Sequence, residues 1–142
     1  MRRKMRYLNK IIFIESANTR YAEIKLDGNV HLIGTQGVGK STLLRALLFF
    51  YNANQQKLGI PIEKKRFVEF YYPYQNSFIV YEVMHENGAF SVMTYKSRGR
   101  VVFRFFNSEY KQAYFINQSD GRIAESWDVV RDNLGRHGVK YT

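Results

Sequence analysis

Residues 34–41 read Gly-Thr-Gln-Gly-Val-Gly-Lys-Ser, which matches the phosphate-binding pattern G-x-x-x-x-G-K-[ST]. This pattern constrains the fold because it needs a strand directly before it and a helix directly after it. Val30–Ile33 is a short, mainly apolar run, and Thr42–Tyr51 is a mostly apolar run without glycine or proline. We therefore predict a strand, a loop and a helix here, and not a glycine-rich hairpin turn with an incidental lysine.

The residue types of this motif indicate its chemistry. Glycines let backbone N–H groups point at phosphate oxygens, Lys40 can reach the β- and γ-phosphates, and the Ser41 hydroxyl can hold Mg²⁺. The positive end of the following helix adds to the attraction for phosphate. We expect a site for ATP and Mg²⁺, with Ser41 as metal ligand, formed by Gly34, Thr35, Gln36, Gly37, Val38, Gly39, Lys40, Ser41 and Thr42.

Composition predicts a globular, cytoplasmic protein. A chain of 142 residues can bury a core, and 45% hydrophobic residues with 16% aromatics argue against disorder. The sequence contains no cysteine, which excludes a disulfide framework and a thiolate metal site. The longest apolar run, Ala46–Tyr51, is far shorter than the roughly 20 residues of a membrane-spanning helix. We therefore expect no membrane partner.

The charge is strongly positive, with 22 Lys and Arg against 12 Asp and Glu, a net charge of +10. Such an excess favours an anionic partner, nucleic acid first, although a solvated basic surface that keeps the protein soluble accounts for it equally well. The candidate DNA contacts lie around one expected hairpin turn and are Lys96, Arg98, Arg100 and Arg104. A second basic group, near an expected helix, consists of Lys57, Lys64, Lys65 and Arg66.

Hydrophobic periodicity and turn residues predict the remaining elements. The expected strands cover residues 7–16, 21–26, 30–33, 77–85, 89–96, 100–106 and 110–116. The expected helices cover residues 40–51, buried on most sides, 61–70, and 127–134, with Ser126 as N-cap and Gly135 just past the end. Residues 77–116 carry no helix signal, so we expect an antiparallel layer there.

A P-loop ATPase also needs an acidic element that holds Mg²⁺ and polarises water. Glu15 and Glu82 each follow a short apolar run, but the first lies upstream of the motif and the second inside an alternating strand. We interpret both as ordinary strand glutamates and assign no catalytic residue. The chain alone is therefore expected not to turn over ATP.

The succession of a strand, a hairpin, the motif, a buried helix and an antiparallel layer resembles the N-terminal half of an ABC-type ATPase head. It is most similar to the structural-maintenance-of-chromosomes (SMC) superfamily, especially its MukB and JetC-like members. The residues that fall on the loop pattern of that superfamily are Gly34, Gly37, Gly39, Lys40, Ser41 and Thr42. Gln36 departs from this pattern, because such heads usually carry Asn there; the departure concerns the fine contacts of the loop and not the phosphate cradle.

The resemblance implies an α/β P-loop NTPase fold of the ABC-head type, with a mixed sheet and an antiparallel layer packed on the P-loop helix. Residues 1–142 would form the N-terminal lobe of a split head, followed by a coiled coil and a C-terminal lobe with the signature and acidic motifs. The implied partners are that C-terminal lobe, a second head in a homodimer, DNA and kleisin-type subunits.

The resemblance also implies that Arg20 or Tyr21 touches the nucleotide, and that a glutamine lid exists, for which Gln75 and Gln118 are the candidates. Plain turn and loop positions remain the alternative for all four residues. For the whole protein we expect an SMC-like ATPase that acts on DNA by ATP-driven dimerisation. The alternative is a P-loop nucleotide switch or small-molecule phosphotransferase without a DNA role. An interaction module with a decayed loop is disfavoured, because the motif is intact.

Overall fold

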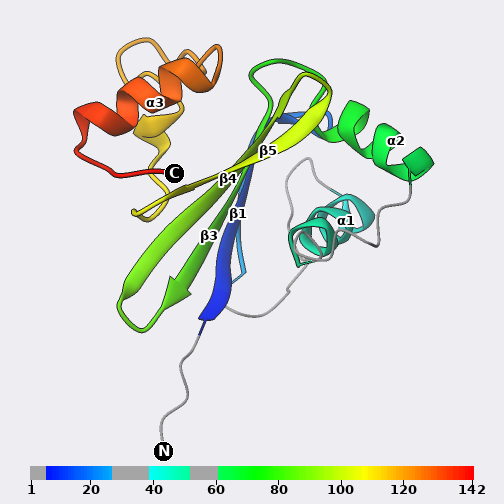
Figure 1. Cartoon of the computed structure of the whole chain (residues 1–142), viewed down its shortest axis with the longest axis horizontal. Helices are drawn as coiled ribbons and strands as arrows, with labels where there is room; N and C mark the ends of the chain where they lie inside the picture. The colour runs from blue at the N-terminus through cyan, green and yellow to red at the C-terminus, as the bar shows by residue number, and fades with distance from the viewer. Residues whose placement is uncertain (1–5, 27–38, 52–60) are drawn as a thin grey trace, which may run out of the picture.

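The computed structural model describes residues 6–26, 39–51 and 61–142, and its centre is a five-stranded sheet (Figure 1). The strands are β1 (Arg6–Ser16), β2 (Thr19–Lys25), β3 (Phe78–His85), β4 (Gly88–Ser97) and β5 (Arg100–Phe106). Their order across the sheet is β2-β1-β3-β4-β5, and every neighbouring pair is antiparallel. Three of the four pairs are consecutive hairpins, which accounts for the antiparallel arrangement, because a two-residue connection cannot return a strand parallel to its neighbour.

This sheet contradicts the predicted fold class. We expected a mixed α/β sheet of the P-loop NTPase, ABC-head type, and the described part of the chain instead forms a small antiparallel sheet with few helices. Its three α-helices are α1 (Lys40–Tyr51), α2 (Pro61–Tyr71) and α3 (Trp127–Arg136). The strand predicted over residues 30–33 lies outside the described residues. The prediction of antiparallel strands after residue 77 is confirmed for β3, β4 and β5.

Tight turns set the strand register at two corners of the sheet. Ala17 and Asn18 join β1 to β2 with φ angles of 53° and 63°, and Arg98 and Gly99 join β4 to β5 with φ angles of 54° and 76°. Positive φ at both central residues is the geometry of a type I′ turn, whose twist matches that of the two strands. Glycine adopts it without strain and asparagine tolerates it, whereas Ala17 and Arg98 are held there by the strands on either side.

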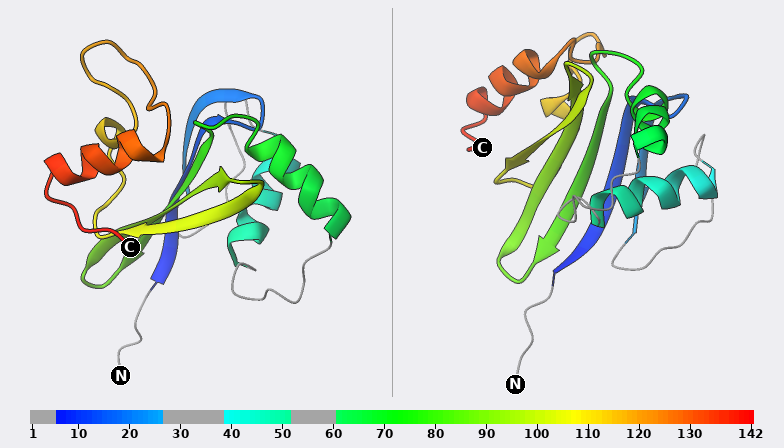
Figure 2. Two further views of the ribbon diagram at one scale, coloured as in Figure 1. Left: turned by 45° about the horizontal axis from the view of Figure 1, so that its top comes forward. Right: turned by 45° about the vertical axis from the view of Figure 1, so that its right-hand side comes forward.

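Helices α1 and α2 lie on one side of the sheet and α3 lies on the other (Figure 2). Each side of the sheet has its own hydrophobic core. Along β3, Ile79, Tyr81 and Val83 face the core under α1 and α2, while Phe78 and Val80 face the core under α3. Both sets are buried because each face of the strand is covered, and side chains alternate between the faces. We call the two sides the α1 face and the α3 face.

The helices follow the sequence predictions in position but not in every detail. α1 begins and ends where predicted, whereas α2 and α3 each run further, and α3 continues through Gly135. Ser126 is the N-cap residue of α3, but its side chain makes no capping hydrogen bond. The chain leaves α3 through Gly138, which has a φ of 69° and so takes the left-handed conformation expected of Gly135.

Two further predictions are wrong: the burial of α1 on most sides and the strand over residues 110–116. α1 buries one side only: Leu43, Ala46 and Leu47 are buried, whereas Leu44 and Leu48 are 44% and 58% exposed. The strand predicted over residues 110–116 is a short 3₁₀ helix, Gln112–Tyr114, followed by an isolated bridge between Ile116 and Ile123. Its backbone is held by α3, because the Asn133 side chain donates to the Tyr114 carbonyl at 2.8 Å. None of the helices in the described ranges is long and apolar enough to cross a membrane.

Candidate phosphate-binding site at the start of helix α1

The end of the glycine-rich motif lies at the start of α1. Gly34, Thr35, Gln36, Gly37 and Val38 lie outside the described residues. Gly39 immediately precedes the helix, Lys40 and Ser41 are exposed in its first turn, and Thr42 is half-buried. The Leu43 N–H donates to the Gly39 carbonyl at 3.0 Å, so the first helical hydrogen bond begins within the motif.

This geometry leaves anion-binding groups at the helix start. The amide groups of Lys40, Ser41 and Thr42 precede the first helical hydrogen bond and have no acceptor within the helix. The positive end of the helix dipole lies at the same place, and the first turn contains no acidic residue that would repel an anion. The exposed side chains of Lys40 and Ser41 add one positive charge and one hydroxyl.

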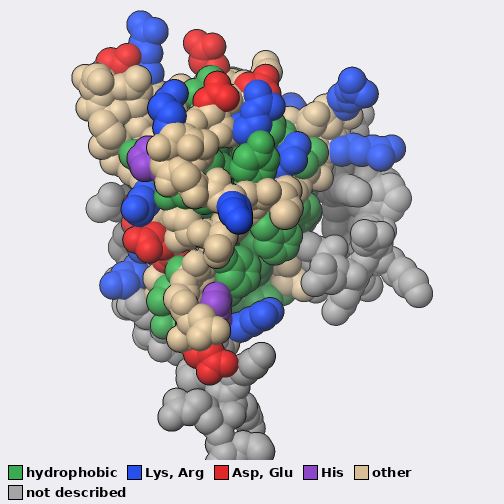
Figure 3. Space-filling model, turned by 60° about the vertical axis from the view of Figure 1, so that its left-hand side comes forward, with side chains coloured by type: hydrophobic (Ala, Val, Ile, Leu, Met, Phe, Trp, Pro, Cys, Tyr) green, Lys and Arg blue, Asp and Glu red, His purple; other side chains and the backbone are tan. Residues whose placement is uncertain are grey.

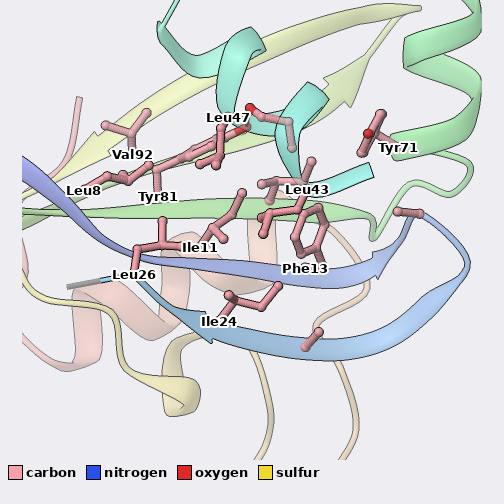
Figure 4. Packing of buried hydrophobic residues seen from close by; sticks show 14 of the residues in the cluster. Leu8, Ile11, Phe13, Ile24, Leu26, Leu43, Leu47, Tyr71, Tyr81 and Val92 are labelled. Atoms are coloured by element: carbon pink, nitrogen blue, oxygen red, sulfur yellow. Dashed lines mark hydrogen bonds between the residues drawn. The ribbon is translucent and has the colours of Figure 1, made fainter. Parts of the chain in front are cut away.

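Apolar packing fixes α1 on the sheet (Figure 4). Leu43 and Leu47 lie against the sheet in a cluster with Ile11 and Phe13 of β1 and Tyr81 of β3, and Leu43, Ile11, Phe13 and Tyr81 are fully buried. The Tyr81 ring also stacks on Phe50 near the end of the helix, with ring centroids 4.3 Å apart. The buried side of α1 thus fixes the position of its first turn relative to β1 and β3.

Two tyrosine hydroxyls add directional contacts to α1. The Tyr71 hydroxyl, at the end of α2, donates to the Thr42 carbonyl at 2.6 Å, and the Tyr81 hydroxyl donates to the Ala46 carbonyl at 2.9 Å. Burial raises the pKa of Tyr71 to about 12 and that of Tyr81 well above its usual value. Both hydroxyls therefore stay protonated at neutral pH and keep their role as donors.

A metal at this site would rest on Ser41 and the phosphates. Ser41 is exposed at the helix start, where its hydroxyl is accessible to an ion. Within the described ranges, no group of three or more His, Asp and Glu side chains is arranged to hold a metal ion. The residues present fit Mg²⁺ bound together with phosphate, because this ion keeps several waters and takes few protein ligands in such sites.

The two glutamates considered as acidic elements have structural contacts. Glu82 is 3% exposed on the α3 face, where its carboxylate accepts from the Asn9 side chain at 2.7 Å and from the Tyr110 N–H at 2.9 Å. The sheet therefore separates it from Lys40. Glu15 has a φ of 48° near the end of β1, and its carbonyl accepts a hydrogen bond from the Ser77 hydroxyl. Their interpretation as strand glutamates agrees with these positions.

The candidates for nucleotide contacts lie on different sides of the sheet. Arg20 is exposed and shares its side of β2 with Ala22, which belongs to the core under α1. Tyr21 lies on the α3 face, where its hydroxyl is 2.8 Å from that of Tyr110. The two glutamine candidates occupy a turn and a loop, which agrees with their interpretation as plain turn and loop residues. Gln75 is exposed, and the Gln118 side chain donates to the nearby Ile116 carbonyl.

The four basic candidates for DNA contact do not share a face. Arg98 lies in the β4–β5 turn, while Lys96 pairs with Val101 on the α1 face, and Arg100 lies on the opposite side of β5. Arg104 lies 4.6 Å over the Trp127 ring, and its Nε donates to the Tyr95 hydroxyl at 3.1 Å. Figure 3 shows one side of the molecule, where Lys and Arg side chains are scattered around hydrophobic ones and do not form one patch.

The second basic group is only partly described. Lys57 lies outside the described residues, and the side chains of Lys64 and Lys65 do too. Arg66 is exposed on α2. Of this group, only the positive charge of Arg66 can therefore be placed, on the α1 face of the sheet.

Sequence reasoning missed the two tyrosines that hold α1. Alternation in β3 does indicate that Tyr81 faces the same side as Ile79, but it does not identify the Ala46 carbonyl as its partner. Tyr71 is the last residue of α2, one position beyond the helix predicted from Pro61. The clue in the sequence is a tyrosine among buried positions, since a buried phenol needs a hydrogen-bond partner.

Comparisons with known proteins give one match. A family model described as a protein of unknown function, DUF3584, matches residues 13–142. No curated protein and no solved structure matches the chain. The matched range includes the motif, the three α-helices, the end of β1 from residue 13 onward, and strands β2 to β5.

Proposed function

We propose that this chain, which belongs to the DUF3584 family, binds ATP with Mg²⁺ through residues 34–42. The observation that carries the proposal is the first turn of α1. There Gly39, Lys40 and Ser41 end the phosphate-binding motif at a helix start, where the amide groups have no acceptor within the helix and the first turn has no acidic side chain. Lys40 would reach the β- and γ-phosphates, Ser41 would ligate the metal, and the bound ion would neutralise phosphate charge.

The dependence of ATP binding on Mg²⁺ tests this proposal. We expect Mg²⁺ to increase the affinity of the chain for ATP, and Ser41→Ala to lose most of that increase because the metal loses its hydroxyl ligand. Isothermal titration with ATP, in Mg²⁺ and in EDTA, measures both effects. Ser126→Ala is the matched control, since Ser126 also lies at the start of a helix, as its N-cap residue, and its side chain makes no capping hydrogen bond. An absence of ATP binding, or equal Mg²⁺ dependence in wild type and Ser41→Ala, would contradict the proposal.

We further propose that the chain is the N-terminal part of an SMC-like ATPase that acts on DNA by ATP-driven dimerisation. Support comes from the motif, from the likeness of its residues to the SMC loop pattern, and from the net charge of +10. In this proposal a C-terminal lobe supplies the acidic element, a second head completes the dimer, and kleisin-type subunits bind the assembly. Hydrolysis then belongs to the whole protein and not to residues 1–142 alone.

The salt dependence of DNA binding tests the second proposal. Arg98 and Arg100 are exposed at the β4–β5 turn, and neither forms an ion pair with any acidic side chain that the structure describes. Phosphate contacts release counterions, so log K should fall linearly with log salt, by about 0.9 per neutralised phosphate. We expect Arg98→Ala with Arg100→Ala to weaken duplex binding similarly on unrelated sequences and to flatten that slope by about one to two units.

The matched control removes two charges elsewhere. Arg122 and Arg131 are largely or partly exposed and face the carboxylates of Asp120 and Asp128. The pair Arg122→Ala and Arg131→Ala should therefore leave the slope unchanged at the same net charge. Coincident curves for wild type and the turn variant would remove the hairpin as a DNA surface. A chain that binds ATP but no DNA would favour the nucleotide switch or phosphotransferase.

A further inference from the structure

We propose that Tyr71 is a positioning residue. Its hydroxyl fixes the first turn of α1, where the phosphate-binding motif ends, through the peptide group between Thr42 and Leu43. This inference rests on the proposed binding of ATP and identifies how that site is held in place. The carbonyl of this peptide group accepts from the Tyr71 hydroxyl at 2.6 Å. Its N–H, on Leu43, donates to the Gly39 carbonyl at 3.0 Å.

One planar group therefore connects α2 to the motif. A peptide group is rigid, so the direction of its N–H follows from the direction of its carbonyl. Holding the Thr42 carbonyl with a short hydrogen bond thus also orients the bond to Gly39. The amide groups that would face phosphate, on Lys40 and Ser41, lie between these two fixed points.

Tyr71 is itself held on several sides. Its ring stacks on Phe67 with centroids 4.2 Å apart and lies 6.5 Å from the Phe13 ring of β1. The neighbouring Phe70 carbonyl accepts from the Ala17 N–H at 3.3 Å, in the tight turn between β1 and β2. Because β1, the β1–β2 turn and α2 together hold the Tyr71 ring in place, its hydroxyl has a fixed position from which it can orient the start of α1.

Tyr81 gives the chain its own control. Its hydroxyl also donates to a carbonyl of α1, but to Ala46, one turn further from the motif. Tyr71→Phe and Tyr81→Phe each remove one hydroxyl and keep the ring. The two variants thus differ in which turn of α1 loses its hydrogen bond.

The test compares the affinities of wild type, Tyr71→Phe and Tyr81→Phe for ATP with Mg²⁺ and for inorganic triphosphate, well below the unfolding temperature. We expect Tyr71→Phe to weaken both ligands by about 2- to 10-fold, the range that one hydrogen bond of ordinary net strength represents. Tyr81→Phe should change neither affinity, although it lowers the resistance to urea. Equal decreases in affinity for ATP and for triphosphate would mean that the variant weakens the contacts to phosphate.

Amide hydrogen exchange provides a readout that needs no ligand. Tyr71→Phe should speed exchange at Leu43, in the first turn of α1, and Tyr81→Phe should speed it in the later turns instead. If Tyr71→Phe binds ATP as wild type does, the positioning role is wrong while the proposed function stands. If wild type binds neither ATP nor triphosphate, the proposed function fails and the positioning role fails with it.

Discussion

Lys40→Ala is expected to reduce the affinity of the chain for ATP by about two orders of magnitude or more. The variant removes the positive charge that the motif directs at the β- and γ-phosphates. Truncating one partner of a close, hydrogen-bonded charge pair commonly changes affinity by factors of this size, because the other charge is left without a partner. Isothermal titration of wild type and variant with ATP and Mg²⁺ measures the loss.

A second exposed lysine separates this effect from general charge. Lys111 is exposed near the 3₁₀ helix, in the layer on the α3 face, so Lys111→Ala removes one charge on the other side of the sheet. It should bind ATP as wild type does. Lys40 is itself exposed, so Lys40→Ala should unfold at the same urea concentration as wild type. Equal ATP affinities for wild type and Lys40→Ala would mean that residues 34–42 are not a nucleotide site.

Phe13→Ala is expected to lower the free energy of unfolding by about 3–5 kcal/mol. Phe13 is fully buried on the inner strand β1 and belongs to the cluster that packs this strand against Leu43 of α1 and Tyr71 of α2. Removing the ring takes away packing against both helices and leaves a cavity in this cluster. Because domains of this kind are stable by only about 5–15 kcal/mol, the loss is a large share of the total.

Urea unfolding followed by circular dichroism measures this loss. Phe105→Ala is the matched control, because the Phe105 side chain is 50% exposed at the edge strand β5. It should lower the free energy of unfolding by less than about 1 kcal/mol. If both phenylalanine variants unfold at the same urea concentration, then the cluster under α1 is not a principal source of stability.

The sequence predicts local elements better than their assembly. β5 and α1 have the predicted bounds, because alternation in residues 100–106 and the apolar run after Lys40 are strong local signals. The mixed sheet, which the resemblance to ABC-type heads implied, was wrong. Strand pairing depends on which strand edges meet in three dimensions, and no local pattern in the sequence records this. The hydrophobic pattern of residues 110–116 and the turn residues after it predict a strand, but the chain forms a short 3₁₀ helix there, whose Tyr114 carbonyl accepts a hydrogen bond from the Asn133 side chain.

The candidate site is predictable only in its chemistry. Gly39, Lys40 and Ser41 follow from the motif, and their place at the start of α1 agrees with the sequence. The hydroxyl of Tyr71 is a tertiary contact that joins residues 29 positions apart, so no local pattern contains it. The burial of α1 was overestimated for a related reason. The apolar residue types of Leu44 and Leu48 do not indicate whether another element of the fold covers them.

The placement of Trp127 has a practical consequence for spectroscopy. It is the single tryptophan of the chain, and it lies on the α3 face between Tyr95 and Tyr141, under the Arg104 guanidinium. The sheet separates this indole from the start of α1. Its emission therefore reports the docking of α3 on the sheet and is insulated from a ligand at Lys40. Binding studies of this chain need a label on the ligand or on α1, while the native indole serves as an independent monitor of the opposite layer.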